Sequence, residues 1–325
     1  MSIERSSRTR AKSRRLLVVG ACLALSVLVF AEIGLRVAGF GNPVVYRPSP
    51  AGYEVVPDQN VRLLGRSIHI SNLGTRGPDA TSLPAAGTER VMLLGDSVVF
   101  GGNQTDDRET MSTRLQDELR RSGIRAEVLN ASAGGWAVAN ESAWLKEHGS
   151  LGSELVVLVI NAKDLDVPFV GSNALEDQVN LPTRRPASAI GFFVEKVLLP
   201  KISGRFARSD PGSTPSAFVA VNTAPMLTAV AQISEQLRRE GRSLLVMYWD
   251  TTGTPDAAEK AARDRLFRFL QNRNVEVVRP QFNLRPDART LYRDYIHPAP
   301  SGDAEAARLV ASTIVNNGLL RFQHD

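Results

Sequence analysis

A serine directly after a Gly-Asp pair is the first residue in this sequence that could do chemistry. Ser97 follows Gly95 and Asp96, where a short apolar run ends. A serine at the carboxyl end of a strand, ahead of a helix, presents its hydroxyl at the rim of a sheet, and nearby backbone N–H groups can stabilise an oxyanion. The same serine could equally cap a turn. By itself, the position predicts either a nucleophile or a cap.

A serine nucleophile needs a general base and a group that orients this base. Three of the four histidines lie where a histidine is commonplace: His69, His148 and His324. His297 differs, because it lies in the loop 294–298 ahead of the last predicted helix. Asp294 can accept the imidazole Nδ1–H, which leaves Nε2 free to deprotonate Ser97. We interpret Ser97, His297 and Asp294 as a candidate triad; the alternative is an ordinary polar surface loop.

Alternating strands and helices have to position these residues. The apolar runs predict buried strands at 91–94, 127–129, 155–160, 243–248 and 275–278. Helical spacing and end signals predict helices at 109–121, 137–148, 217–239, 255–271 and 302–315. This alternation predicts a three-layer α/β/α domain with a central, mostly parallel sheet. Such sheets carry their chemistry at the carboxyl ends of the strands, where Ser97 and His297 fall.

The first 39 residues have the pattern of a signal anchor. Residues 1–15 carry six basic side chains and one acidic one, and the sixteen residues 16–31 carry no charge. A bilayer needs ~20 apolar residues, a length reached by 16–39 if Glu32 and Arg36 lie at the far interface. Positive charge before the span predicts a single-pass membrane protein with a cytoplasmic N-terminus and a periplasmic or extracellular body. A cleaved signal peptide, a lipoprotein signal and a twin-arginine signal are weaker alternatives.

Composition divides the remainder of the chain into two parts. Residues 40–89 are rich in Gly, Pro and Ser and predict a linker or N-terminal extension. Residues 90–325 hold the strand–helix alternation, which is interrupted at 168–216 by a segment rich in Pro, Ser and Gly. We interpret this interruption as an insertion or lid.

Charge and composition exclude several functional classes. The net charge of +5 belongs to the N-terminal tail, because the other 33 basic and 33 acidic residues cancel, and aromatic residues are only 6% of the chain. No nucleic-acid partner is therefore expected. A single cysteine excludes an internal disulfide and a cysteine-based zinc site. Asp96, Asp164 and Asp166 near strand ends lack a histidine cluster, so neither a metal nor another cofactor is expected.

The combination of Gly95-Asp96-Ser97 and Asp294-x-x-His297, in this order, resembles the SGNH/GDSL hydrolases. The stretch 130–135, Asn-Ala-Ser-Ala-Gly-Gly, is similar to the family's second block, which implies that the Gly135 N–H donates to the oxyanion. The segment 72–77, Asn-Leu-Gly-Thr-Arg-Gly, looks like the segment before the core in membrane-anchored members. The resemblance implies a flavodoxin-like SGNH hydrolase fold for residues 90–325.

The third block of the family departs from its usual Gly-x-Asn-Asp pattern here. Residues 161–164 read Asn-Ala-Lys-Asp, so Lys163 stands where the family places its oxyanion asparagine. Either Asn161 substitutes as a donor or Lys163 stabilises the oxyanion by its charge. The same departure leaves open a loss of activity.

The resemblance implies a membrane-anchored serine esterase or acylhydrolase that works through an acyl-enzyme. Its substrate would be an ester, such as an O-acetyl group, on an envelope or extracellular small molecule or polysaccharide. One alternative uses the same site for transfer, as an O-acyltransferase or deacetylase that modifies cell-surface polysaccharide. The other alternative is a catalytically impaired binding protein with the same fold, which Lys163 favours.

Overall fold

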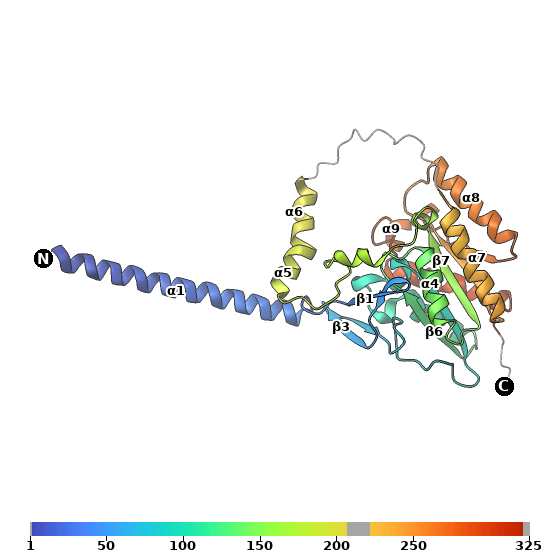
Figure 1. The fold of residues 1–325 in the computed structure, drawn as a ribbon, viewed down its shortest axis with the longest axis horizontal. Coiled ribbons are helices and arrows are strands. Elements are labelled where there is room, and N and C mark those ends of the chain that lie inside the picture. Colours follow the sequence, from blue (N-terminus) through green and yellow to red (C-terminus); the bar gives the residue numbers. More distant parts are fainter. Residues whose placement is uncertain (1, 207–221, 321–325) are drawn as a thin grey trace.

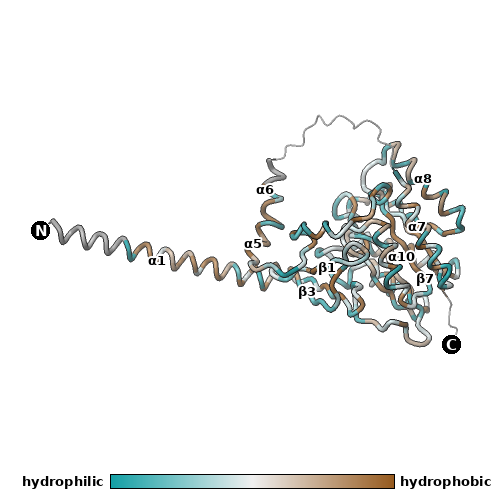
Figure 2. Tube along the Cα trace, in the orientation of Figure 1, coloured by the Kyte–Doolittle hydropathy of each residue, from teal (hydrophilic) through white to brown (hydrophobic). Residues whose placement is uncertain are grey.

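The computed structural model of the protein describes residues 2–206 and 222–320. A long helix, α1 (Ser2–Val37), extends away from the rest of the chain, as Figure 1 shows. Within it, Arg14–Val37 is long and apolar enough to cross a membrane, and no part of its apolar window is buried. Figure 2 shows this apolar stretch along α1. The predicted apolar helix is therefore present and free of protein contacts along its middle.

Five strands form the central sheet, and all of its pairs are parallel. Its order is β6-β5-β7-β8-β9. The strands are β5 (Glu89–Gly95), β6 (Ala126–Ser132), β7 (Leu155–Asn161), β8 (Ser243–Trp249) and β9 (Glu276–Val278). The predicted α/β/α fold with a parallel sheet is confirmed. Because both faces are covered, the strands are apolar along their length rather than alternating with polar residues.

Helices cover both faces of this sheet. The long ones are α3 (Met111–Arg121), α4 (Val138–His148), α7 (Ala224–Arg239), α8 (Ala257–Gln271) and α10 (Pro300–Asn316). Alternate strand residues point to opposite faces: Met92 and Val156 pack in one core with α4, α7 and α8, whereas Val91 and Val157 pack in the other with α3 and α10.

Local capping explains where the predicted helices begin. Thr110 accepts a hydrogen bond from the Thr113 N–H, so α3 starts two residues later than predicted. Pro225 lies in the first turn of α7, and this helix begins at Ala224. Residues 217–221 of the predicted helix lie outside the described residues.

Short elements make up most of the connections. The short helices are α2 (Ser97–Phe100), α5 (Ala189–Phe193), α6 (Leu199–Phe206) and α9 (Ala288–Leu291). The 3-10 turns are η1 (Gly102–Gln104), η2 (Asp107–Glu109), η3 (Ala162–Leu165), η4 (Ser172–Glu176) and η6 (Phe282–Leu284), and η5 (Val194–Leu198) is a π-helical turn. Where it is described, the predicted insertion 168–216 therefore contains η4, α5, η5 and α6, together with irregular segments.

The extension 40–89 is folded into two antiparallel hairpins. They are formed by β1 (Tyr46–Ser49) with β2 (Gly52–Val55), and by β3 (Gln59–Leu63) with β4 (Arg66–Ile70). Apolar side chains of both hairpins, including Tyr53 and Ile68, are buried in the core on the α4 side of the sheet. The extension is thus packed against the α/β domain.

A close backbone contact joins α9 to the start of α10. A Cβ added at Gly302 would lie 2.1 Å from the carbonyl oxygen of Leu291. That oxygen also accepts a hydrogen bond from the Ala299 N–H at 2.9 Å. Residues 291–299 form the loop that carries Asp294 and His297, so the missing side chain at Gly302 allows this loop to close.

We predict that Gly302→Ala lowers the melting temperature of the protein. A methyl group in this contact has to displace backbone, and overpacking of this kind destabilises by about 2 kcal/mol. Gly191→Ala is the matched control, because its added Cβ meets nothing closer than 3.7 Å. Thermal unfolding of the full chain in detergent, followed by circular dichroism, checks the prediction. An unchanged melting temperature for Gly302→Ala would contradict it.

Candidate active site

A tight turn after β5 presents Ser97. Asp96 caps helix α2 by accepting a hydrogen bond from the Val98 N–H at 2.8 Å, and Ser97 is the first residue of this helix. A Cβ at Gly95 would lie 2.4 Å from a methyl group of Val99. The Gly-Asp-Ser order therefore has a local reason: glycine allows the close turn, aspartate caps it, and serine stands at the carboxyl edge of the sheet.

The structure brings together the three residues of the candidate triad. His297 Nε2 lies 3.0 Å from Ser97 Oγ, across 200 residues of sequence, and His297 Nδ1 lies 2.8 Å from Asp294 Oδ2. A carboxylate only accepts, so Nδ1 carries the proton and Nε2 is the acceptor for the serine hydroxyl. This is the arrangement that a serine nucleophile and its general base require.

Backbone donors keep Asp294 ionised. Burial raises the pKa of this carboxyl, but N–H groups of His297 and Ile296 and the imidazole outweigh burial and lower the pKa below its usual range. The two N–H groups donate to Asp294 Oδ1 at 2.8 and 3.0 Å. The same bonds fold the loop back on itself, so the charged carboxylate and the imidazole are held in one short turn.

The end of β8 anchors the loop that carries His297. The indole N–H of Trp249 donates to the Ile296 carbonyl at 2.6 Å, and the hydroxyl of Tyr292 donates to the Asp250 carbonyl at 2.8 Å. The Asp250 carboxylate forms two hydrogen bonds with Arg279, at 2.9 and 3.0 Å. The backbone of Asp250, directly after β8, therefore helps to position the histidine loop.

Gly135, the predicted oxyanion donor, lies at the same pocket as Ser97. Its φ of +80° favours glycine, and an added Cβ would lie 2.9 Å from the hydroxyl of Tyr53. That hydroxyl donates to the Gly134 carbonyl at 2.8 Å, and the Trp136 indole donates to the Tyr53 carbonyl at 2.8 Å. Strand β2 of the extension therefore positions the glycine loop, a contact that sequence analysis missed.

Asn161 and Lys163 are placed differently from the expectation. Asn161 is fully buried, and its amide donates to Asp96 at 3.0 Å. Lys163 is exposed, with its ammonium 4.7 Å from the ring centroid of Tyr295. Neither residue lines the pocket that holds Ser97. The structure thus brings Gly135 to this pocket, whereas the amide of Asn161 bonds to Asp96, which caps α2, and the ammonium of Lys163 lies over Tyr295.

The pocket at Ser97 has a volume of about 470 Å³. Beside the triad residues and the glycine loop, its walls come from the segment after α2, from β1 and from the predicted insertion. Residues that sequence analysis did not single out supply these walls: Tyr46, Asn103, Gln104, Asp177, Asn180 and Lys196. Amide and charged side chains therefore lie around the nucleophile, together with apolar surface.

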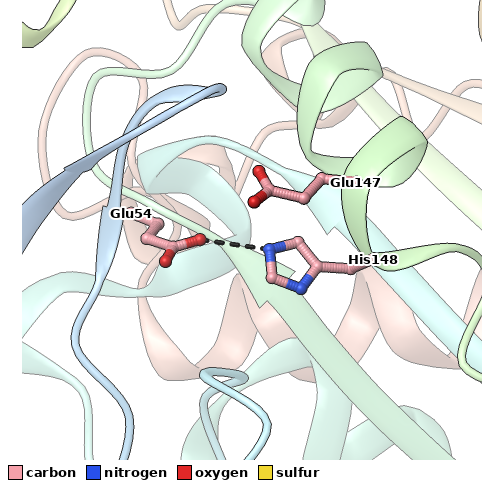
Figure 3. A group of neighbouring side chains, drawn as sticks. All are labelled: Glu54, Glu147 and His148. Carbon is pink, nitrogen blue, oxygen red and sulfur yellow. Dashed lines mark hydrogen bonds and ion pairs between the residues drawn. The ribbon is translucent and has the colours of Figure 1, made fainter.

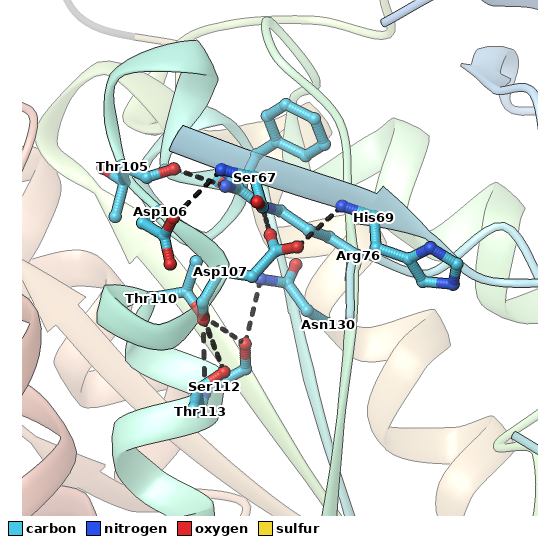
Figure 4. Close-up of polar contacts among 12 residues, drawn as sticks. Ser67, His69, Arg76, Thr105, Asp106, Asp107, Thr110, Ser112, Thr113 and Asn130 are labelled. Atoms are coloured by element: carbon cyan, nitrogen blue, oxygen red, sulfur yellow. Dashed lines mark hydrogen bonds and ion pairs between the residues drawn. The ribbon is translucent and has the colours of Figure 1, made fainter. Parts of the chain in front are cut away.

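A buried arginine holds the segment after α2. Arg76 is 2% exposed, and its guanidinium donates to the carbonyls of Phe100, Gly102 (2.8 Å) and Thr105 (2.6 Å) and to the Asp107 carboxylate (2.9 Å). Figure 4 shows Arg76, in the segment after β4, with Thr105 and Asp107 of the loop. Segment 72–77, which resembles a family motif, thus supplies a cation that fixes one wall of the pocket.

Three carboxyl groups are buried behind Ser97. Burial, together with their mutual repulsion, raises the pKa of Glu141 and Asp164 well above the usual range. Burial also raises the pKa of Asp96. Both carboxyl oxygens of Glu141 lack a hydrogen-bond partner among the described residues. Adjacent buried carboxyls repel one another when ionised, so burial and repulsion both favour their protonated forms.

A second group of ionisable side chains lies at the end of α4. One ligand atom each from Glu54, Glu147 and His148 lies within 4.8 Å of the others, as in a metal site (Figure 3). Glu54, however, already accepts from Arg47 at 2.6 Å and from His148 at 3.1 Å. Both oxygens of the Glu54 carboxylate are therefore already bound within the protein, to Arg47 and to His148.

We predict that Glu141→Gln stabilises the protein increasingly as the pH rises. Because its pKa is raised in the folded state, the Glu141 carboxyl binds its proton more tightly there than in the unfolded chain. The free energy of unfolding of the wild type therefore falls as the pH rises from the pKa of the unfolded state, about 4.3, towards the pKa of the folded state. Glutamine does not ionise, so the stability of the variant does not fall with pH for this reason. Melting temperatures at about pH 5 and about pH 8 measure the difference.

Glu147→Gln is the control, because Glu147 lies on the same helix and is exposed. Its effect on the melting temperature should not grow with pH. A pH-independent difference between Glu141→Gln and the wild type would contradict the burial argument.

Several solved structures are similar to this chain. One is a crystal structure of TesA, at 16% identity and a TM-score of 0.46, covering 71% of this chain and 100% of that one. Another is the lipase/acylhydrolase from Enterococcus faecalis, at 13% identity and a TM-score of 0.45, covering 73% of this chain and 100% of that one. A family 3 carbohydrate esterase from Clostridium thermocellum is similar at 14% identity and a TM-score of 0.41, covering 71% and 96%. No protein-family model and no curated protein matches the chain.

Proposed function

We propose that this protein is a serine esterase or acylhydrolase. The observation that supports this most directly is the hydrogen-bonded chain from Ser97 through His297 to Asp294 at the wall of the 470 Å³ pocket. Nucleophile, base and orienting acid lie in reach of one another before any substrate binds. Acyl transfer to serine is the chemistry that needs this order of groups.

The geometry suggests how the reaction proceeds. Ser97 Oγ attacks the ester carbonyl carbon and its proton passes to His297 Nε2, while Asp294 stabilises the imidazolium. The oxyanion faces the N–H groups of Ser97 and Gly135, and each such donor typically lowers the barrier by about 3 kcal/mol. His297 then protonates the leaving alcohol oxygen as the C–O bond breaks. Water attacks the resulting acyl-serine by the reverse proton path and releases the acid.

We further propose that α1 anchors the enzyme in a membrane. Its apolar stretch follows the basic tail, which favours a cytoplasmic N-terminus and a body in the periplasm or outside the cell. An enzyme placed there would meet esters of envelope or extracellular molecules, such as O-acetyl groups on small molecules or polysaccharide. The amide and charged side chains at the pocket offer hydrogen-bond partners to the hydroxyl groups of such a substrate.

Transfer to a sugar hydroxyl is the second candidate function. It uses the same acyl-enzyme, and the amide side chains of Asn103, Gln104 and Asn180 at the pocket could hold an acceptor. The two functions differ in whether water or an acceptor hydroxyl attacks the acyl-serine. A product assay with an O-acetyl donor, with and without an acceptor glycan, separates them.

Fluorophosphonate labelling of the full chain in detergent tests the proposed nucleophile. We expect the wild type and a Ser122→Ala control to be labelled, since Ser122 is an exposed serine on the far end of α3. Ser97→Ala should lose all labelling. Asp294→Asn should retain a trace, because loss of the orienting carboxylate slows such triads by about 10⁴-fold. Labelling that survives in Ser97→Ala, or a folded wild type that is never labelled, would refute the proposal; the latter would favour a binding protein.

Tyr53→Phe should lower kcat about fivefold with little change in KM. The variant loses one hydrogen bond to Gly134, worth about 1 kcal/mol, and with it the constraint on the oxyanion donor next to it. Steady-state hydrolysis of a p-nitrophenyl ester measures both constants. Tyr248→Phe is the matched control, because this buried hydroxyl has no partner in the described part of the chain. A drop in kcat of the same size in both variants would show that Tyr53 does not act through Gly134.

A further inference from the structure

An apolar helical segment stands beside the membrane-span helix with one side uncovered. It consists of α5, the π-helical turn η5 and the start of α6, and we call residues 189–202 the side helix. Three of its large apolar side chains are exposed: Leu198 (41%), Leu199 (52%) and Ile202 (43%). Figures 1 and 2 show α6 standing away from the sheet domain, with apolar residues along it. An exposed apolar patch of this kind marks an interaction surface.

The side helix is attached to the end of α1. The Glu32 carboxylate accepts hydrogen bonds from the Ser188 hydroxyl and from the N–H groups of Ala189 (2.8 Å) and Ile190 (3.0 Å). Arg36 donates to the Ala187 carbonyl at 2.7 Å. These contacts fix the first turn of the side helix beside the two charged residues that end the apolar span.

An aromatic contact and the direction of the side helix complete this placement. The rings of Phe40 and Phe193 pack edge to face, with their centroids 5.0 Å apart. Figure 1 shows α6 running across the direction of α1 rather than along it. If a bilayer contains the apolar part of α1, its surface lies near Glu32 and Arg36. A helix that starts there and runs across the direction of α1 is therefore parallel to the membrane surface.

We propose that the side helix lies in the interfacial layer of the bilayer, with Leu198, Leu199 and Ile202 inserted among the lipid headgroups and upper acyl chains. Helices that bind in this way combine an apolar side with lysines that meet anionic headgroups. Lys201 is exposed next to Ile202 and supplies such a charge. Continuity with α1 favours lipid over a second copy of the chain, because the bilayer is already at this level wherever α1 is inserted.

The side helix also reaches the candidate active site. Lys196 lines the pocket of Ser97, and its ammonium donates to the Val179 carbonyl at 3.0 Å and to Asn180. If the side helix contacts the membrane, the pocket wall that contains Lys196 therefore lies at the bilayer surface. The inference rests on the proposed anchoring by α1 but not on ester hydrolysis, and it is tested without an activity assay.

Quenching of a bimane probe by brominated lipids provides the test. The full chain with Cys22→Ala receives a single cysteine by Leu199→Cys or Ile202→Cys and is reconstituted in phosphatidylcholine/phosphatidylglycerol vesicles. Lys260→Cys on the exposed side of α8 is the matched aqueous control, and Leu25→Cys in the apolar part of α1 reports insertion. Separate vesicles carry bromine near the top of the acyl chains or near their methyl ends.

We expect strong quenching at positions 199 and 202 by the shallow bromines, and little at position 260. Position 25 should be quenched by the deep bromines. Quenching at 25 with none at 199 and 202 would overturn the docking of the side helix while α1 remains an anchor. No quenching at 25 would overturn both. Disulfide-linked dimers through position 199, without quenching there, would show that a second copy covers this surface and would also overturn the proposal.

Discussion

The imidazole of His297 has to stay within hydrogen-bond distance of two groups that come from different parts of the chain. It lies 2.8 Å from Asp294 and 3.0 Å from Ser97, 200 residues away. Displacement by about 1 Å at such a site can reduce a rate ~100-fold. A parallel sheet meets this constraint, because its carboxyl ends share one edge. The end of β5 supplies the serine, and the end of β8 holds the histidine loop through Trp249.

The N-terminal extension stabilises the other walls of the site. Tyr53 of β2 bonds to the glycine loop, and Arg76 in the segment after β4 bonds to the loop after α2, so two side chains of the extension hold two pocket walls. Burying the charge of Arg76 is unfavourable in isolation. The Asp107 carboxylate and three carbonyls accept hydrogen bonds from its guanidinium, and removing one partner of such a group is far more destabilising than the pair itself is stabilising. The extension is for this reason part of the site's framework.

The pKa values of the carboxyl groups around the nucleophile are shifted in opposite directions for a physical reason. Asp294 receives two backbone N–H bonds and the imidazole proton, which favour its charged form. Glu141 and Asp164 lie in the core next to another carboxyl, which favours their neutral forms. Negative charge is thereby concentrated on the carboxylate that faces the imidazole, where an imidazolium would form. Because the pKa values of Glu141 and Asp164 are raised, these carboxyl groups contribute less negative charge than two fully ionised carboxylates would.

The sequence by itself determined the α/β/α fold and pointed to the triad residues. Strands that are covered on both faces have to be apolar along their length, and such runs are visible without a structure. Gly95-Asp96-Ser97 and Asp294-x-x-His297 are local patterns whose spacing reflects a tight turn and a short loop. Only the tertiary structure decided that the amide of Asn161 bonds to Asp96, that Lys163 faces Tyr295, and that Tyr53, Arg76 and Lys196 reach the site. These contacts join residues far apart in the chain, 81 positions in the case of Tyr53 and Gly134. Local periodicity records which face of an element is buried, but it carries no information about which distant side chain will lie opposite.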